Sequence, residues 1–90
     1  TELLWVDDDL YIMQRPGDAA RPGLILVLNN RGDGWNGTWV STRWRDTSLE
    51  PVAWWSARDL SRPHDQWAHT DGRAELWAPP RGYAIYMPRP

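Results

Sequence analysis

The order of apolar and polar positions along this chain predicts short β-strands separated by turns. Apolar residues come in brief runs bounded by Pro, Gly, Asn and Asp, and no segment keeps a helical period beyond about two turns. The runs that predict strands are residues 10–15, 24–28, 38–44, 51–56, 66–70, 73–78 and 83–87. Many short strands with regular turns are typical of a sandwich. We therefore expect a single domain, residues 1–90, that folds as an all-β, antiparallel Greek-key β-sandwich of seven to eight strands.

Three segments stand out from this alternation. Residues 24–28 (LILVL) are apolar throughout, which predicts a central strand covered on both faces. Residues 29–37 are rich in Gly and Asn and predict a loop. Residues 57–65 (ARDLSRPHD) are mostly polar and predict a connection between strands that is long enough for one helical turn.

The dipeptide Asp71-Gly72 lies between two strand-like runs and predicts a two-residue type I′ hairpin. Because Leu76 is expected in the core, this register also assigns core positions to the other members of its face. The side chains expected to face the core are Trp67, His69, Ala74 and Leu76. The side chains expected on the opposite face are Gln66, Ala68, Glu75 and Trp77.

The same alternation assigns faces on three further strands. Val40 is the natural core residue of its strand, which places Trp39, Ser41 and Arg43 on the outer face. On the last strand, Tyr83, Ile85 and Met87 are expected to point inward, and Ala84 and Tyr86 outward. Trp54 and Trp55 are adjacent on one strand, so they must face opposite sides.

The composition adds an excess of large aromatic residues. The chain has eight tryptophans, three tyrosines, no phenylalanine and no cysteine, so no disulfide can stabilise it. A short chain can build its core from about four or five large rings, since each buries about 150–250 Å². We expect Trp44 and Trp67 in that core. Several tryptophans are then left for the surface.

The net charge and the length of the apolar runs argue against two classes of partner. The net charge is −2, whereas nucleic-acid binding needs a concentrated basic face. No apolar run approaches the roughly 20 residues of a membrane span. The first ten residues contain three aspartates and no basic residue, unlike a signal peptide. We expect neither nucleic acid nor a membrane as partner.

Catalytic and metal-binding patterns are weak. A glycosidase needs two carboxyl groups flanking the scissile bond, yet the chain has only three glutamates and most of its aspartates fall in predicted turns. The sequence has no Gly-x-Ser-x-Gly elbow, and its two histidines lack acidic partners at ligand spacing. Asp7, Asp8 and Asp9 predict a solvated turn rather than a calcium site, because consecutive side chains alternate in direction. We expect a non-catalytic domain without metal or cofactor.

Three stretches carry a resemblance to a known family. They are LLWVDDDLYIMQR (residues 3–15), GLILVLNNRGDGWNGTWVSTRW (23–44) and DGRAELWAPPRGYAIYMPR (71–89). In order and spacing the chain resembles the C-terminal β-sandwich, domain C, of glycoside hydrolase family 13 α-amylases. It departs from the closing pattern of that domain, because Arg73 replaces the usual Trp and Leu76 the usual Phe. Residues 57–65 are longer than the equivalent loop of several relatives.

The resemblance implies a Greek-key sandwich packed beside a catalytic (β/α)8 barrel that this chain lacks. In the family the barrel carries the catalytic carboxylates and calcium sites, domain C supports the barrel, and some members bind sugar on domain C. Family members are often secreted, so the localisation that the resemblance implies is extracellular. The sequence itself does not assign a compartment.

Two functions remain open. In the first, the chain is an accessory domain of a starch-degrading enzyme that binds α-glucan by stacking exposed indoles on sugar rings. The candidate sugar-binding residues are Trp35, Trp39, Ser41, Arg43, Trp55 and Trp77, with Trp54 as the alternative to Trp55, and with Gln66 and Glu75 beside Trp77. In the second, the domain only packs on the barrel, and outward tryptophans such as Trp5 belong to that interface. Polar partners beside the tryptophans would favour the first function, and a continuous apolar patch the second.

Overall fold

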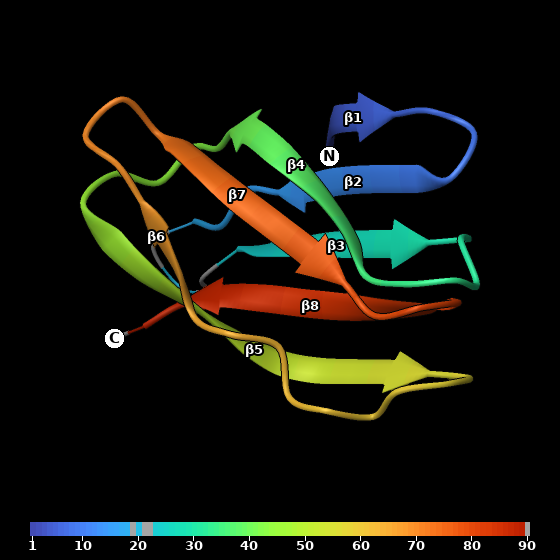
Figure 1. Ribbon diagram of the computed structural model, residues 1–90. Helices are drawn as coiled ribbons and strands as arrows, with labels where there is room; N and C mark the ends of the chain where they lie inside the picture. Colours follow the sequence, from blue (N-terminus) through green and yellow to red (C-terminus); the bar gives the residue numbers. More distant parts are fainter. Residues whose placement is uncertain (19, 21–22, 90) are drawn as a thin grey trace.

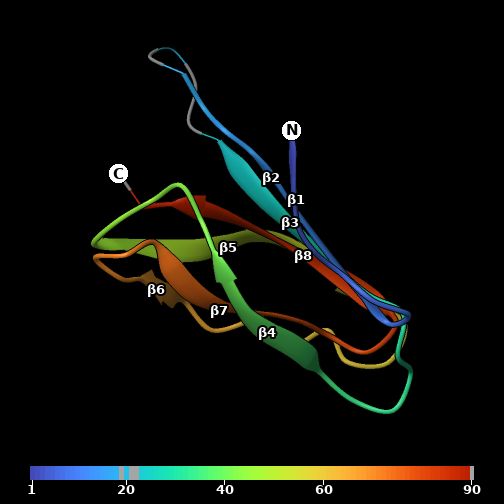
Figure 2. The ribbon, with the colours of Figure 1, turned by 90° about the horizontal axis from the view of Figure 1, so that it is seen from above.

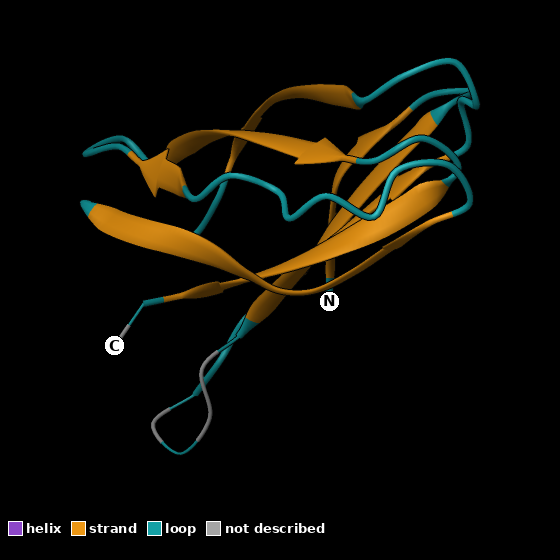
Figure 3. Cartoon of the chain, turned by 60° about the horizontal axis from the view of Figure 1, so that its bottom comes forward, coloured by secondary structure: helices purple, strands orange, loops and turns teal. Residues whose placement is uncertain are grey.

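Every regular element that the structure describes is a β-strand (Figure 1). A computed structural model describes residues 1–18, 20 and 23–89, and these contain no helix (Figure 3). The strands are β1 (Glu2–Val6), β2 (Leu10–Arg15), β3 (Leu24–Asn29), β4 (Asn36–Ser41), β5 (Thr47–Ser56), β6 (Gln66–Ala68), β7 (Arg73–Ala78) and β8 (Gly82–Pro88). All their pairings are antiparallel. The all-β, antiparallel fold class is confirmed, and Greek-key connectivity stays a prediction.

The strands form two layers. Six of them make one sheet in the order β1-β2-β3-β8-β5-β6, and β4 pairs with β7 in a second sheet. Seen from above, β4 and β7 lie against one face of the larger sheet (Figure 2). The long strand β5 pairs with β8 over residues 49–56 and with β6 over residues 47–49, and a bulge between Pro51 and Ala53 interrupts its pairing with β8. Bulges bend strands, and the larger sheet curls so that β6 comes beside β7.

The core between the layers is aliphatic apart from Tyr86. The buried hydrophobic residues are Leu10, Ile12, Ile25, Val27, Val40, Leu49, Ala68, Ala74, Leu76, Ala78, Ala84 and Tyr86. Four of these twelve are alanines, which let the layers approach closely and leave little room for an indole. None of the eight tryptophans is fully buried. Trp44 packs partly against the core, but the expected core position of Trp67 is wrong, because its side chain is 49% exposed.

The turn at residues 70–72 differs from the predicted hairpin by one residue. The backbone carbonyl oxygen of His69 accepts a hydrogen bond from the Gly72 N–H at 2.9 Å, and the backbone N–H of His69 donates to Arg73 O at 2.9 Å. With Gly72 at a φ of 90°, this is the pattern of a three-residue loop with glycine in the left-handed region. A shift of one residue turns a strand over. Trp67 and His69 are therefore exposed and Ala68 is buried, opposite to expectation, while Ala74 and Leu76 occupy the expected core positions.

The last strand is also turned over relative to the expectation. Ala84 and Tyr86 are fully buried, because β8 pairs with β3 so that they lie beside the buried Val27 and Ile25. Tyr83, Ile85 and Met87 point to the other face. Both faces of β8 carry apolar residues, so the alternation could not tell which face was the core.

The central strand β3 is covered on one face only. Ile25, Val27 and Asn29 are buried, whereas Leu28 is 40% exposed and Leu24 and Leu26 are half-buried. The expectation of cover on both faces is wrong within the described residues. It follows that the larger sheet presents a second apolar face.

The remaining strand expectations are close to the structure. β2 and β7 begin and end where expected, and Val40 is buried with Trp39, Ser41 and Arg43 exposed. The first strand, β1, was not predicted, and residues 57–65 form no helical turn. Trp54 packs against the core and Trp55 is exposed, as their adjacency required.

Candidate functional site

Two of the candidate tryptophans line one hollow. Trp35, in the β3–β4 loop, and Trp77, on the outward face of β7, border a cavity of about 370 Å³, which we call the tryptophan hollow. Its other lining residues are polar and come from the β5–β6 connection and the first residue of β6: Asp59, Ser61, Arg62, His64 and Gln66. The hollow thus combines indole surfaces with hydrogen-bonding groups.

Trp35 is held by a hydrogen bond across the hollow. Its indole Nε1 donates to Asp59 Oδ2 at 3.0 Å, and the Ser61 N–H donates to Asp59 Oδ1 at 3.0 Å. Hydrogen bonds from Ser61, which have the largest effect, and from Trp35 hold the pKa of Asp59 below its ordinary value. Asp59 is therefore ionised at neutral pH, and its carboxylate keeps lone pairs for a further partner.

Trp77 lies over a glycine of the neighbouring strand. Gly37 is its partner in the β4–β7 register, and a Cβ atom at Gly37 would overlap the Trp77 indole and Leu76 O. The absence of a side chain at position 37 therefore lets the indole of Trp77 lie close against β4. Because Leu76 and Ala78 are buried, Trp77 must point outward from the core.

The start of the β5–β6 connection, which forms one wall of the hollow, is fixed to the sheet. Ser56 is buried, donates its hydroxyl to Pro80 O, and accepts hydrogen bonds from the backbone N–H of Arg58 at 3.0 Å and of Asp59 at 2.9 Å. The indole of Trp54 donates to Leu60 O at 3.1 Å. These bonds set the position of Asp59.

The end of the connection is anchored as well. Pro63 is fully buried, and Asp65 pairs with Arg62 and Arg89, each at 3.0 Å. Arg89 also pairs with Glu50 on β5 at 3.3 Å. Anchors at both ends mean that the wall of the tryptophan hollow is formed in the free protein.

The second candidate site surrounds Trp39. Its ring is 44% exposed, with the Arg73 guanidinium carbon 5.7 Å from the ring centroid and the His69 ring at 5.7 Å. These residues, with Thr70 and Asp71, line an open hollow of about 770 Å³. The cation–π contact of Arg73 occupies a face of the indole that a sugar would need.

The expected partners of Trp39 are only partly beside it. Arg43 follows the end of β4, and its guanidinium pairs with Glu2 on β1. The Arg43 N–H donates to Gln14 Oε1 at 3.0 Å. Ser41 is exposed on the same face as Trp39 and lies opposite Arg73 in the β4–β7 register. A sugar site of Trp39, Ser41 and Arg43 stays a prediction, and Arg73 and His69 are the side chains in contact with the Trp39 ring.

Trp55 belongs to a different surface. The registers of β1, β2, β3, β8 and β5 place a series of apolar side chains on the face turned away from β4 and β7, which we call the outer sheet face. Its members are Leu3, Val6, Tyr11, Met13, Leu24, Leu26, Leu28, Ala53, Trp55, Tyr83, Ile85 and Met87. Trp55 is 50% exposed there, beside Tyr83. The outer sheet face is a continuous apolar patch without a partner in the described chain.

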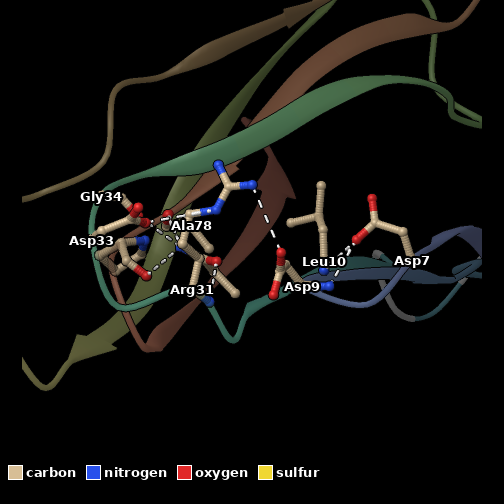
Figure 4. Close-up of polar contacts among 9 residues, drawn as sticks. Asp7, Asp9, Leu10, Arg31, Asp33, Gly34 and Ala78 are labelled. Carbon is tan, nitrogen blue, oxygen red and sulfur yellow. Dashed lines mark hydrogen bonds and ion pairs between the residues drawn. The ribbon is translucent and has the colours of Figure 1, made fainter.

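The Asp7–Asp9 turn borders one end of this face, at a hollow of about 570 Å³. Asp7 Oδ1 accepts hydrogen bonds at 2.8 Å from the backbone of Asp9 and Leu10, and its Oδ2 accepts one from Trp5 Nε1 at 2.9 Å. The hydrogen bond from Trp5, which has the largest effect, and the one from the Asp9 N–H hold the pKa of Asp7 below its ordinary value. Asp9 pairs with Arg31 at 3.7 Å (Figure 4). Asp7 therefore stabilises the turn itself, and Asp9 links the turn to the β3–β4 loop.

Sequence reasoning found the two tryptophans and Gln66 but not the rest of the hollow. Asp59, Arg62 and His64 lie in a segment without periodicity, so no pattern showed which way they point. The one available signal was the length of residues 57–65. Within residues 1–18, 20 and 23–89, no group of three or more acidic or histidine side chains is placed to hold a metal ion, and no helix has the length and apolar character of a membrane span.

Comparisons with known proteins add no family. No protein-family model matches the chain, and no curated protein matches it. The likeness to domain C of the α-amylases therefore stays a prediction, and the function is argued from the two surfaces just described.

Proposed function

We propose that this chain is a non-catalytic accessory domain of an α-amylase-like, starch-degrading enzyme, and that it binds α-glucan in the tryptophan hollow. One observation carries the proposal. Trp35 and Trp77 remain outside an aliphatic core and share a single hollow with five polar side chains. A sugar ring needs both kinds of group, because its C–H faces stack on indoles while its hydroxyls form hydrogen bonds.

The contrast with Trp39 supports this choice of site. Arg73 lies over the Trp39 ring, and a sugar would have to displace it. The indole N–H of Trp35 is occupied by Asp59, and among the described residues no ring or cation contact covers the face of Trp35. A preformed site loses less conformational entropy on binding.

Titration with maltoheptaose, followed by tryptophan fluorescence, tests the proposal. We expect saturable binding that Trp77→Ala weakens by about tenfold or more, since loss of one stacking contact costs about 1.4 kcal/mol. Trp67→Ala is the matched control, because Trp67 is an exposed tryptophan outside the hollow and should bind like the wild type. An absence of saturable change up to about 10 mM sugar would overturn the proposal.

A second candidate function is favoured by the outer sheet face. A domain that only packs on the catalytic barrel needs a broad apolar surface, and apolar patches of this kind mark interfaces. Trp55 belongs to this face, whereas Trp35 and Trp77 line the tryptophan hollow, and Trp5 lies beside the buried Ile12 in the β1–β2 register. Packing and sugar binding use separate residues, so one domain can perform both.

Dye binding tests whether the outer sheet face is an interaction surface. We expect the isolated chain to bind anilinonaphthalene sulfonate, and the double variant Leu28→Thr/Trp55→Thr to lose more than about half of that signal without a lower Tm, because these exposed side chains lie outside the core. Leu60→Thr is the control, since Leu60 is exposed on the β5–β6 connection. Equal dye binding by all three proteins would contradict the interface function.

A further inference from the structure

We propose that the tryptophan hollow receives the non-reducing end of an α-glucan chain and not a segment from within the chain. This inference rests on the proposed function and adds which part of the glucan is recognised. It is drawn from the size of the hollow, from the bond that bridges two of its segments and from the chemistry of its polar groups.

The hollow is small. Its volume of about 370 Å³ corresponds to on the order of twelve water molecules at ~30 Å³ each, which is the space of about two hexose units. A site for the interior of a chain has to let the chain enter and leave, and is usually an open groove. A site of this volume is filled by a terminal unit and its neighbour.

The hydrogen bond between Trp35 and Asp59 bridges two of the segments around the hollow. It joins the β3–β4 loop to the β5–β6 connection at 3.0 Å. A glucan that passed between these two segments would have to break this bond. The anchors at Ser56 and Asp65 oppose such a movement, because they hold both ends of the connection.

The polar groups match sugar hydroxyls. Asp59 keeps lone pairs on its two oxygens, Gln66 carries an amide, and Arg62 keeps N–H groups beyond those that donate to Pro63 O and Asp65, so each can bind a sugar hydroxyl. Hydrogen bonds to charged groups are the strong ones. The non-reducing end is the only unit of an α-1,4-glucan with free hydroxyls at the 2, 3 and 4 positions. Interior units have lost the 4-hydroxyl to the glycosidic bond.

Three ligands test the inference on the intact chain. We expect maltoheptaose to bind, and β-cyclodextrin, a ring with the same number of glucose units but no ends, to bind more than about tenfold more weakly. Maltoheptaose blocked at O4 and O6 of its non-reducing end should be weakened to a similar extent. Maltoheptaose reduced to the alditol at its other end should bind like the parent sugar.

The outcomes separate this inference from the function on which it rests. If β-cyclodextrin or the blocked sugar binds as tightly as maltoheptaose, end recognition is wrong while sugar binding stands. If only the alditol loses affinity, the opposite end is recognised and the inference fails. If no sugar binds, the proposed function fails.

A variant tests the part played by Asp59. Asp59→Asn keeps the size of the side chain but removes its charge and one of the two oxygens that accept from Trp35 and Ser61, so we expect maltoheptaose affinity to fall about fivefold or more with a somewhat lower Tm. Asp8→Asn is the matched control, because Asp8 is exposed and lies outside the hollow. Unchanged affinity in Asp59→Asn would remove Asp59 from the recognition of the chain end.

Discussion

Replacement of Asn29 by leucine is expected to lower the free energy of unfolding by about 3–4 kcal/mol. Asn29 is buried, and its Nδ2 donates to the carbonyl oxygens of Gly34, Ala78 and Pro79 at 3.0, 3.3 and 3.1 Å. Its Oδ1 accepts a hydrogen bond from the Arg31 N–H at 2.8 Å. Leucine has a similar shape but no polar atoms, so four backbone groups lose a partner, at a net cost of about 1 kcal/mol each.

The effect should extend to the tryptophan hollow. Gly34 directly precedes Trp35 and Ala78 directly follows Trp77. Gly34 and Ala78, both labelled in Figure 4, accept from the Asn29 amide, which therefore holds together the two segments that carry the tryptophans. Asn29 is therefore a positioning residue. Asn29→Leu should weaken maltoheptaose binding even under conditions where the variant is folded, which a purely global loss of stability would not do.

Urea unfolding measures the first effect, and Asn30→Leu is its control. Asn30 is exposed, and its recorded hydrogen bond is that of its backbone N–H to Asp9 O at 2.8 Å. Its substitution should change stability by less than about 0.5 kcal/mol. A loss below about 1 kcal/mol in Asn29→Leu would mean that water satisfies the four groups and that Asn29 is not a structural link. The expected loss is a large share of the roughly 5–13 kcal/mol typical of a chain of this length.

Alkaline pH is expected to destabilise this protein through Tyr86. The side chain is fully buried and its hydroxyl donates to Trp77 O at 2.9 Å. Burial raises the pKa of Tyr86 to about 12, from an ordinary value of 10.0. The neutral phenol is therefore favoured by the folded state. Stability from this group is complete below pH 10 and is lost as pH rises to about 12, by about 3 kcal/mol in all.

The composition makes this effect easy to isolate. The chain has no lysine, and arginine stays charged in this range, so the three tyrosines are the main side chains that titrate there. Tyr86→Phe should cost about 1 kcal/mol near neutral pH through the lost hydrogen bond. The variant should then show a flatter loss of stability from about pH 10 to about pH 12 in urea unfolding. An equally steep loss in wild type and variant would assign the alkaline loss of stability to another group.

Much of the local structure follows from residue types alone. The strand at residues 10–15 and the strand at 73–78 have the predicted bounds, because Pro, Gly and Asp stop a strand for local reasons. The core position of Val40 and the opposite facing of Trp54 and Trp55 follow from the two-residue period of a strand. The presence of a turn at residues 70–72 was also local information, since Gly72 adopts the left-handed conformation that glycine permits.

The candidate site was only partly accessible in this way. The excess of tryptophans and the positions of Trp35 and Trp77 predicted that both lie at the surface, but nothing along the chain indicated that they line the same hollow. Their approach depends on the β4–β7 register, which places Gly37 under Trp77, and on Asn29, which links the two segments. Asp59 reaches Trp35 only because Ser56 and Trp54 fix the β5–β6 connection.

The sequence by itself determined the fold class, most of the strands and the turn positions, because these depend on backbone preferences within a few residues. Only the tertiary structure decided which face of β8 and β6 is the core. Both faces of β8 are apolar, and the loop before β7 is one residue longer than its Asp-Gly signal suggested, so the decision lay in the pairing of β8 with β3 and in the His69–Arg73 hydrogen bond. For the same reason the outer sheet face and the tryptophan hollow exist only in the folded chain, where distant strands bring their residues together.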